Sequence, residues 1–211
     1  MYMSKNSSNI HYAQKDLPAL RRLIVSSRAN STKRSWIPLI DTQSMSPSLK
    51  GDINLLIEWT QTYHYREGDL LIISKPTLPF MIAHRACSHR AGERGQEILQ
   101  IADDFIFGDE ISVSWIELKD IVGRVIEIRY GQEEQVATLE SMIVQGLGSW
   151  IAKLSLQRFI NLQNRIDGQK KINWFFVRLT TIQHRFACYM FRIVLYINSI
   201  WHLKTSKTIL A

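Results

Sequence analysis

The feature that most constrains the fold is a change of sequence period at Gly131. Before it, short apolar runs alternate with turns rich in Gly, Pro and Asp, which is typical of β structure. After it, apolar residues recur every three or four positions, which indicates helices. Charge changes nearby: residues 1–149 carry 16 basic and 18 acidic side chains, and residues 150–211 carry ten and one. We therefore expect a β-rich core followed by a basic helical region.

The chain divides into three predicted parts. Residues 1–35 form a polar tail with one short helix, which begins near Asp16 and Pro18. Residues 36–131 form the β-rich core, and residues 132–211 form the basic helical region. The predicted fold class is α+β, with a mostly antiparallel sheet. The predicted strands cover residues 36–40, 53–59, 70–73, 80–83, 97–101, 111–115 and 121–130, and the predicted helices cover 139–154 and 172–200.

Cysteine content and hydropathy bear on the compartment. Cys87 and Cys188 are too few for a disulfide framework, so we expect reduced thiols in a reducing compartment. Residues 1–12 lack the apolar segment of a secretory signal. Within residues 172–211 the longest stretch without Lys or Arg, 193–203, is shorter than the ~20 residues that a spanning helix needs. These features predict a cytoplasmic protein, or one that is peripheral at the inner face of the membrane.

Four short motifs follow one another in the core. They are Ser44-Met45-Ser46-Pro47, the Gly-Asp pairs at 51–52 and 68–69, His84-Arg85, and the aspartates Asp103 and Asp109, which lie six positions apart. A serine needs a base to take its proton as it attacks, and a histidine with a pKa near ~6.5 suits that task. Each motif also has a structural explanation: a turn, a hydrogen-bonding histidine and a solvated acidic loop.

The order of these motifs resembles the signal peptidase I family, in the clan that includes the self-cleaving repressors. The closest branch uses serine and histidine, with Ser-Gly-Ser-Met-x-Pro, Gly-Asp, His-Arg, and Thr-Lys-Gly-Asp before a second aspartate. Residues 40–130 carry the resemblance, which implies a catalytic core of signal peptidase/LexA-like type. Gln43 stands where the family has glycine, Ile101-Ala102 stand where it has Lys-Gly, and Asp104 has no counterpart.

The resemblance implies a serine endopeptidase that cleaves a leader or signal segment from a precursor. Ser44 would be the nucleophile and His84 the general base. Asp109, ranked ahead of Asp103, would orient the imidazole. The backbone N–H of Ser44 and the hydroxyl of Thr42 would form the oxyanion hole.

The resemblance also implies how a substrate would bind. An extended peptide would lie along the strand before His84 and the segment before Ser44, by strand addition. The predicted substrate contacts are Met45, Pro47, Ala83 and Arg85. The mechanism needs no cofactor. No metal site is predicted either, because no second ligand cluster follows His84, Cys87 and His89.

Other functions stay open on the sequence. A serine–lysine dyad would need Lys50 or Lys75 at the position that His84 occupies. A catalytically inactive peptide-binding module of the same fold would account for the departure at Gln43. A self-cleaving repressor would need a DNA-binding amino-terminal domain and a base lysine, and the sequence shows neither.

The basic region contains an amphipathic segment at 172–203. Its Phe and Ile side chains fall on one side, and Arg178, Arg185 and Arg192 fall on the other, beside His184. This pattern is typical of a helix on an anionic membrane surface or against a partner. Alternatively the apolar side packs on the core, which we expect for residues 172–179. Sparse charge and the lack of a recognised motif argue against nucleic acid.

Overall fold

A computed structural model describes most of the chain beyond the amino-terminal tail. The described residues are 34–39, 43–51, 53–59, 65–74, 81–91, 97–102, 104, 113–131, 135–166 and 174–209. The short helix predicted near Asp16 lies outside them. The predicted class, α+β with an antiparallel sheet and helices after it, is confirmed.

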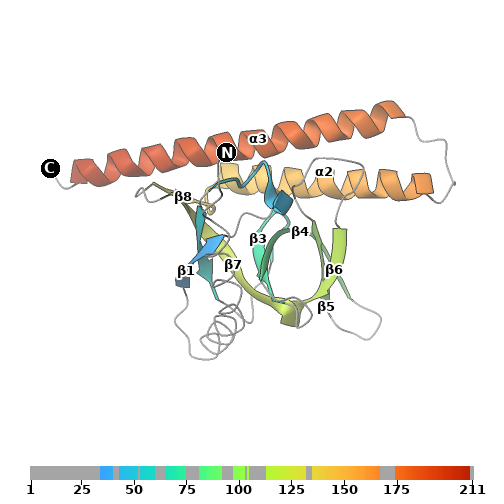
Figure 1. The fold of residues 1–211 in the computed structure, drawn as a ribbon, viewed down its shortest axis with the longest axis horizontal. Coiled ribbons are helices and arrows are strands. Elements are labelled where there is room, and N and C mark those ends of the chain that lie inside the picture. The colour runs from blue at the N-terminus through green and yellow to red at the C-terminus, as the bar shows by residue number, and fades with distance from the viewer. Residues whose placement is uncertain are drawn as a thin grey trace, which may run out of the picture.

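One antiparallel sheet contains eight strands (Figure 1). They are β1 (Arg34–Leu39), β2 (Ile53–Glu58), β3 (Leu70–Ile73), β4 (Ile82–Ala91), β5 (Glu97–Ala102), β6 (Val113–Glu117), β7 (Ile121–Tyr130) and β8 (Val136–Thr138). The order is β1-β2-β7-β3-β4-β5-β6, and β8 pairs with β7. Strand β7 pairs with β2, β3 and β8, so it joins the two halves of the sheet.

Two strands differ from the prediction in ways that affect the site. Strand β4 was predicted to end at residue 83, but it continues to Ala91, so His84 lies within a strand rather than at its end. Strand β8 was not predicted, and it carries the sheet past the boundary placed at Gly131. Two strands, β3 and β7, agree with the predicted ranges 70–73 and 121–130.

The two helices are α2 (Met142–Ile166) and α3 (Trp174–Ile209). They run side by side along one end of the β structure, with α3 on the outside (Figure 1). The hydroxyl of Ser141 accepts a hydrogen bond from the N–H of Val144 at 3.3 Å and caps the start of α2. Within the described part of the chain, neither helix combines the length and apolar character needed to cross a membrane.

The alternation of side chains along β4 separates two parts of the core. Ala83 packs in the main cluster, which lies between the sheet and the helices, and Cys87 packs on Ala152 of α2. Ala86 packs in a second cluster with Leu71, on the other face of the sheet. Because successive residues of a strand point to opposite faces, His84 lies on the face of the second cluster and Arg85 on the helix face.

Glycines allow α2 to lie directly on the turn between β2 and β3. Gly68 has φ +94°, and a Cβ there would lie 2.3 Å from the backbone nitrogen of Ser149. A Cβ on Gly148 would lie 2.9 Å from the carbonyl oxygen of Gly68. A larger side chain at either position would therefore push the helix away from the sheet.

Helix α3 packs against the rest of the protein through one side. At residues 172–179 this side is opposite to the apolar side that was expected to pack there. Its buried residues are Thr180, His184, Ala187, Cys188, Phe191, Leu195 and Ser199. Phe175, Phe176 and Leu179, predicted to pack on the core, are exposed. Small side chains such as Ala187 let α3 approach closely, and the polar His184 meets buried charged groups, so this side fits the interior.

Candidate functional site

The turn that carries Ser44 follows β1 and precedes β2. It begins with the 3-10 helix η1 (Gln43–Met45), and the N–H of Leu49 donates to the carbonyl of Met45 at 2.8 Å. Met45 and Leu49 are buried in the main core cluster, which fixes the turn against the protein. Ser44 itself is half-buried. Ser44 is therefore less buried than Met45, which follows it in the turn.

The predicted base lies on the strand beside this turn. His84 is opposite Leu71 in the pairing of β3 with β4, and it is 8% exposed. The η1 turn contacts β4. The structure thus brings together the two segments that carry Ser44 and His84.

Three predicted site residues lie outside the described part of the chain. They are Asp103, Asp109 and Thr42. Their roles as imidazole orienters and as an oxyanion donor stay predictions.

Asp104 does not agree with the solvated acidic loop that the sequence left open as an alternative. It is 0% exposed and forms an ion pair with Arg85, which is 1% exposed. Nε of Arg85 donates to Oδ1 of Asp104 at 2.9 Å, and Nη2 donates to Oδ2 at 2.6 Å. Two parallel bonds of this kind are the strongest geometry for an arginine and a carboxylate. Burial alone would raise the pKa of Asp104, but the charge and hydrogen bonds of Arg85 lower it below its ordinary value.

The ion pair connects the serine turn to the histidine strand. The backbone N–H of Asp104 donates to the carbonyl of Ser44 at 2.8 Å. Nη1 of Arg85 donates to the carbonyl of Gly68 at 2.9 Å, and the ring of Phe191 covers the guanidinium at 4.6 Å. Arg85 follows His84 directly in β4. Asp104 therefore ties the serine turn to strand β4, a connection that sequence reasoning missed.

The predicted substrate contacts are in the interior. Met45 is 1% exposed, and Pro47 and Ala83 are also buried. The guanidinium of Arg85 is occupied by Asp104 and Gly68. The predicted contact of a substrate with the side chains of Met45 and Arg85 does not agree with this burial, since both sites are filled by the protein itself.

A second serine and histidine lie in contact between the helices. Oγ of Ser155 is 2.8 Å from Nε2 of His184, and both residues are 1% exposed. Nη1 of Arg158 lies 3.3 Å from Nδ1. An arginine can only donate, so Nδ1 accepts, and the proton of the neutral ring is on Nε2. With its proton there, His184 cannot take one from Ser155, so this pair is structural.

The ring nitrogens of His184 also lie near a carboxylate and a thiol. Ligand atoms of Asp104, His184 and Cys188 lie within 4.8 Å of one another. However, Arg85 occupies both oxygens of Asp104, burial raises the pKa of the Cys188 thiol, and a second cation, Arg158, adjoins His184. A bound metal cation needs deprotonated ligands free of competing cations, so this cluster does not suit one.

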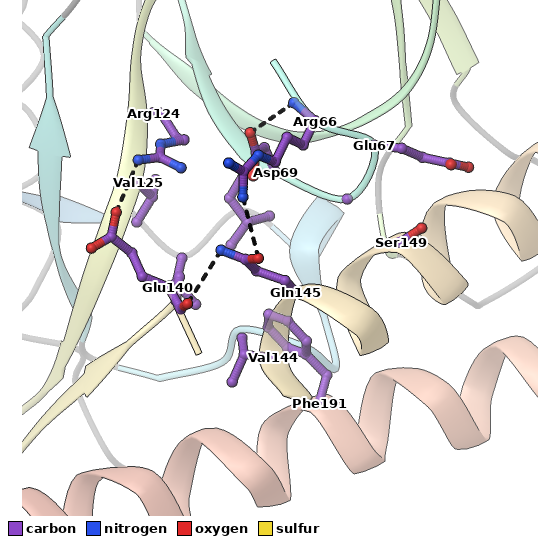
Figure 2. A pocket seen from close by; sticks show the side chains of 13 residues that line it. Arg66, Glu67, Asp69, Arg124, Val125, Glu140, Val144, Gln145, Ser149 and Phe191 are labelled. Carbon is purple, nitrogen blue, oxygen red and sulfur yellow. Dashed lines mark hydrogen bonds and ion pairs between the residues drawn. The ribbon is translucent and has the colours of Figure 1, made fainter. Parts of the chain in front are cut away.

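A pocket of about 190 Å³ opens beside the β2–β3 turn (Figure 2). Arg66, Asp69, Arg124 and Glu140 give its wall both signs of charge, and Phe191, which covers Arg85, closes one side. Burial raises the pKa of Asp69, although the hydrogen bond from the backbone N–H of Arg66 and the charge of Arg124 oppose the shift. Neither Ser44 nor His84 is among the described residues that line this pocket.

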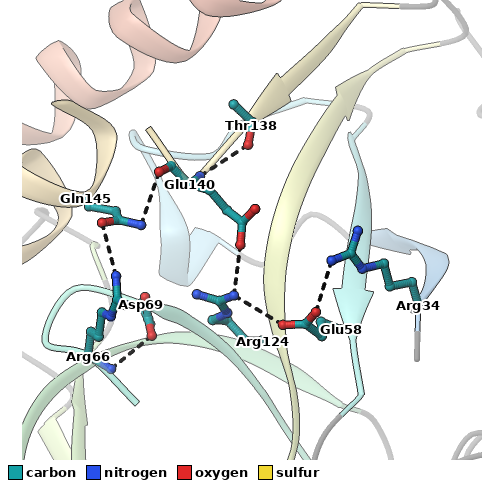
Figure 3. A network of polar contacts seen from close by, with 8 residues as sticks. All are labelled: Arg34, Glu58, Arg66, Asp69, Arg124, Thr138, Glu140 and Gln145. Carbon is teal, nitrogen blue, oxygen red and sulfur yellow. Dashed lines mark hydrogen bonds and ion pairs between the residues drawn. The ribbon is translucent and has the colours of Figure 1, made fainter. Parts of the chain in front are cut away.

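Arg124 links this pocket to the outer strands (Figure 3). Its Nη2 lies 3.2 Å from Oε2 of Glu58 and 3.0 Å from Oε1 of Glu140. Glu58 also pairs with Arg34 of β1 at 3.2 Å. This surface network joins β1, β2 and β7 to the segment before α2.

Comparison of the chain with protein-family models, with curated proteins and with solved structures found no match.

Proposed function

We propose that the chain is a serine endopeptidase of signal peptidase/LexA-like fold, which cleaves a leader or signal segment from a precursor. Ser44 is the nucleophile and His84 the general base. The observation that carries the proposal is the chain of contacts from Ser44 through Asp104 and Arg85 to the strand of His84. These contacts hold the serine turn at a fixed position beside the strand that carries His84, and a nucleophile and its base need fixed positions.

The proposed reaction needs only side chains and water. Oγ of Ser44 attacks the scissile carbonyl carbon, and His84 takes the hydroxyl proton. The N–H of Ser44 and the hydroxyl of Thr42 stabilise the negative oxygen of the tetrahedral intermediate. His84 then protonates the leaving amine, and water releases the acyl group by the reverse sequence of proton transfers. Asp109 or Asp103 holds the imidazole in the required tautomer.

Labelling with a mechanism-based serine acylating probe tests the proposal. The purified chain is incubated with a penem and, separately, with a fluorophosphonate, and the modified peptide is identified by mass spectrometry. We expect an adduct on Ser44 that Ser44→Ala and His84→Ala both abolish. Ser46→Ala, in the same turn, is the matched control and should label normally. Ser155→Ala tests the other serine–histidine pair and should also label.

The outcomes separate the peptidase from its main alternative. Absence of any adduct, in a protein with a cooperative unfolding transition, would contradict the catalytic proposal. The peptide-binding module of the same fold would then be the better explanation, because the closed packing around His84 also suits a structural histidine. Labelling at Ser155 in place of Ser44 would assign the activity to the pair Ser155 and His184, and it would likewise overturn the proposal.

A further inference from the structure

The side of α3 that faces away from the protein is apolar along most of the helix. Six large side chains on it are between 49% and 70% exposed: Phe175, Ile182, Phe186, Ile193, Ile197 and Trp201. They are called the outer face below. Their spacing of four or seven residues places them on one side of the helix, opposite the buried residues His184 and Phe191.

The outer face continues onto the neighbouring helix. Trp150 of α2 is 38% exposed, and its ring meets Phe186 edge to face with the ring centroids 6.3 Å apart. The helix buries its small and polar side and leaves its larger apolar side in water. A folded chain in water rarely leaves a contiguous apolar surface of this extent uncovered, because covering it is favourable. The outer face is therefore a binding surface.

Charge around the outer face decides which partner suits it. Arg178, Arg185 and Arg192 are exposed and recur every seven residues along one edge of the face. Neither α2 nor α3 contains a single Asp or Glu. Two copies packed through this face would bring rows of arginine together without carboxylates to neutralise them. An anionic lipid surface instead offers phosphates to the arginines and acyl chains to the aromatic rings.

We propose that the outer face of α3 binds an anionic lipid bilayer, with the helix lying in the plane of the interface. Phe175, Ile182, Phe186 and the other apolar residues enter the boundary of the acyl chains, and the arginine edge contacts the headgroups. The orientation is parallel to the surface because the exposed arginines from Arg178 to Arg192 lie along the edge of the apolar face rather than at one end of the helix. This proposal does not depend on the peptidase activity.

Flotation of the full chain with lipid vesicles tests the proposal. We expect binding to vesicles of phosphatidylcholine mixed with phosphatidylglycerol and much weaker binding to phosphatidylcholine alone. The triple variant Ile182→Ser/Phe186→Ser/Ile193→Ser should lose binding to both. Replacing Arg178, Arg185 and Arg192 with Gln should reduce binding to mixed vesicles roughly fivefold for each arginine. Trp115→Ser, which removes an exposed aromatic ring from β6, is the matched control and should bind like the unchanged chain.

Two further measurements keep the test decisive. Chemical denaturation should show that the variants fold, since all the changed side chains are exposed in the folded chain. Light scattering without vesicles shows whether a second copy covers the face. A dimer that the serine variant dissociates, with no vesicle binding, would overturn the proposal in favour of self-association. Equal binding to neutral and anionic vesicles, or a monomer that binds neither, would also overturn it.

Discussion

The cluster around Arg85 and the network around Arg124 use the same side chains in different surroundings. Arg85 and Asp104 are both sealed from water, with two bonds between them and an aromatic ring above. Arg124 is also largely buried, but its partner Glu140 is exposed, and the network reaches Arg34 on the surface (Figure 3). Water can therefore replace part of the second set of bonds and none of the first.

This difference indicates that the stability of the fold depends more on the Arg85–Asp104 pair than on the network around Arg124. A buried ion pair adds little stability over apolar residues of the same shape, but the loss of one partner leaves an uncompensated charge in the interior. The partly exposed network should respond weakly to the loss of any one member. The three predictions that follow test that contrast, beginning with the largest expected effect.

Replacing Asp104 with Asn should lower the free energy of unfolding by about 3–5 kcal/mol, because Arg85 would keep its charge without a counterion. Urea denaturation at pH 7 measures this change. Glu67→Gln, at an exposed position, is the control and should change stability by less than ~0.5 kcal/mol. The double variant Arg85→Met/Asp104→Leu should recover much of the loss. A single-variant cost near that of the control would show that the pair does not govern stability.

The second prediction concerns pH. Burial, helped by the charge of Arg158, lowers the pKa of His184 from 6.5 to about 4, although Asp104 opposes the shift. Between these values the unfolded chain binds a proton that the folded chain does not. The contribution of His184 to the free energy of unfolding is therefore fully present above pH 6.5. It falls as the pH drops towards 4, by about 3 kcal/mol in total.

The variant His184→Gln isolates this effect, because glutamine can donate and accept as the neutral ring does but cannot take up a proton. Denaturation of both proteins across this pH range gives the two slopes. We expect the variant to lose most of the pH dependence. Identical slopes in the two proteins would show that His184 is not the titrating group. The Asp104 pair does not add to this loss in the same window, because its lowered pKa places its titration below pH 4.

The smallest effect is expected in the surface network. Arg124→Gln should cost about 1–2 kcal/mol, because it removes two charged hydrogen bonds whose carboxylate partners regain water. Arg34→Gln, at the exposed end of the same network, should cost less than ~0.5 kcal/mol, and added salt should reduce even that. A cost for Arg124→Gln as large as that for Asp104→Asn would remove the contrast between the two clusters.

Local patterns in the sequence predicted much of the sheet and little of the site. Strand β3 is an unbroken apolar run, and the second half of β7 alternates apolar with charged residues, so both strands are recognisable from the sequence. Strand β4 was predicted too short because His84 and Arg85 interrupt its apolar run, although both are buried in the sheet. Polar residues inside a strand are not recognisable until their partners are known.

The partners come from pairings distant in the sequence. Asp104 meets Arg85 because β5 pairs with β4, where Ala102 lies opposite Arg85. The sequence did hold one indication of this pair. Side chains alternate along a strand, so Arg85 points to the same face as Ala83 and Cys87, which is the face that the helices cover. A buried arginine on that face needs a carboxylate as its partner. The periodicity of α3 identified its apolar side correctly but not what that side faces. Which side of α3 faces the protein depends on the close fit of small residues such as Ala187 against the core.

The ring of Phe191 over Arg85 also sets an order of events during synthesis of the chain. A ribosome releases the whole sheet, with Ser44, His84 and Asp104, before it releases α3. Until then the guanidinium lacks the cover of Phe191, and an ion pair is weaker where water reaches it. Met45 and Leu49 of the serine turn also lack their core neighbours from α3. A chain that still lacks α3 would therefore carry Ser44, His84 and Asp104 without the ring that covers Arg85.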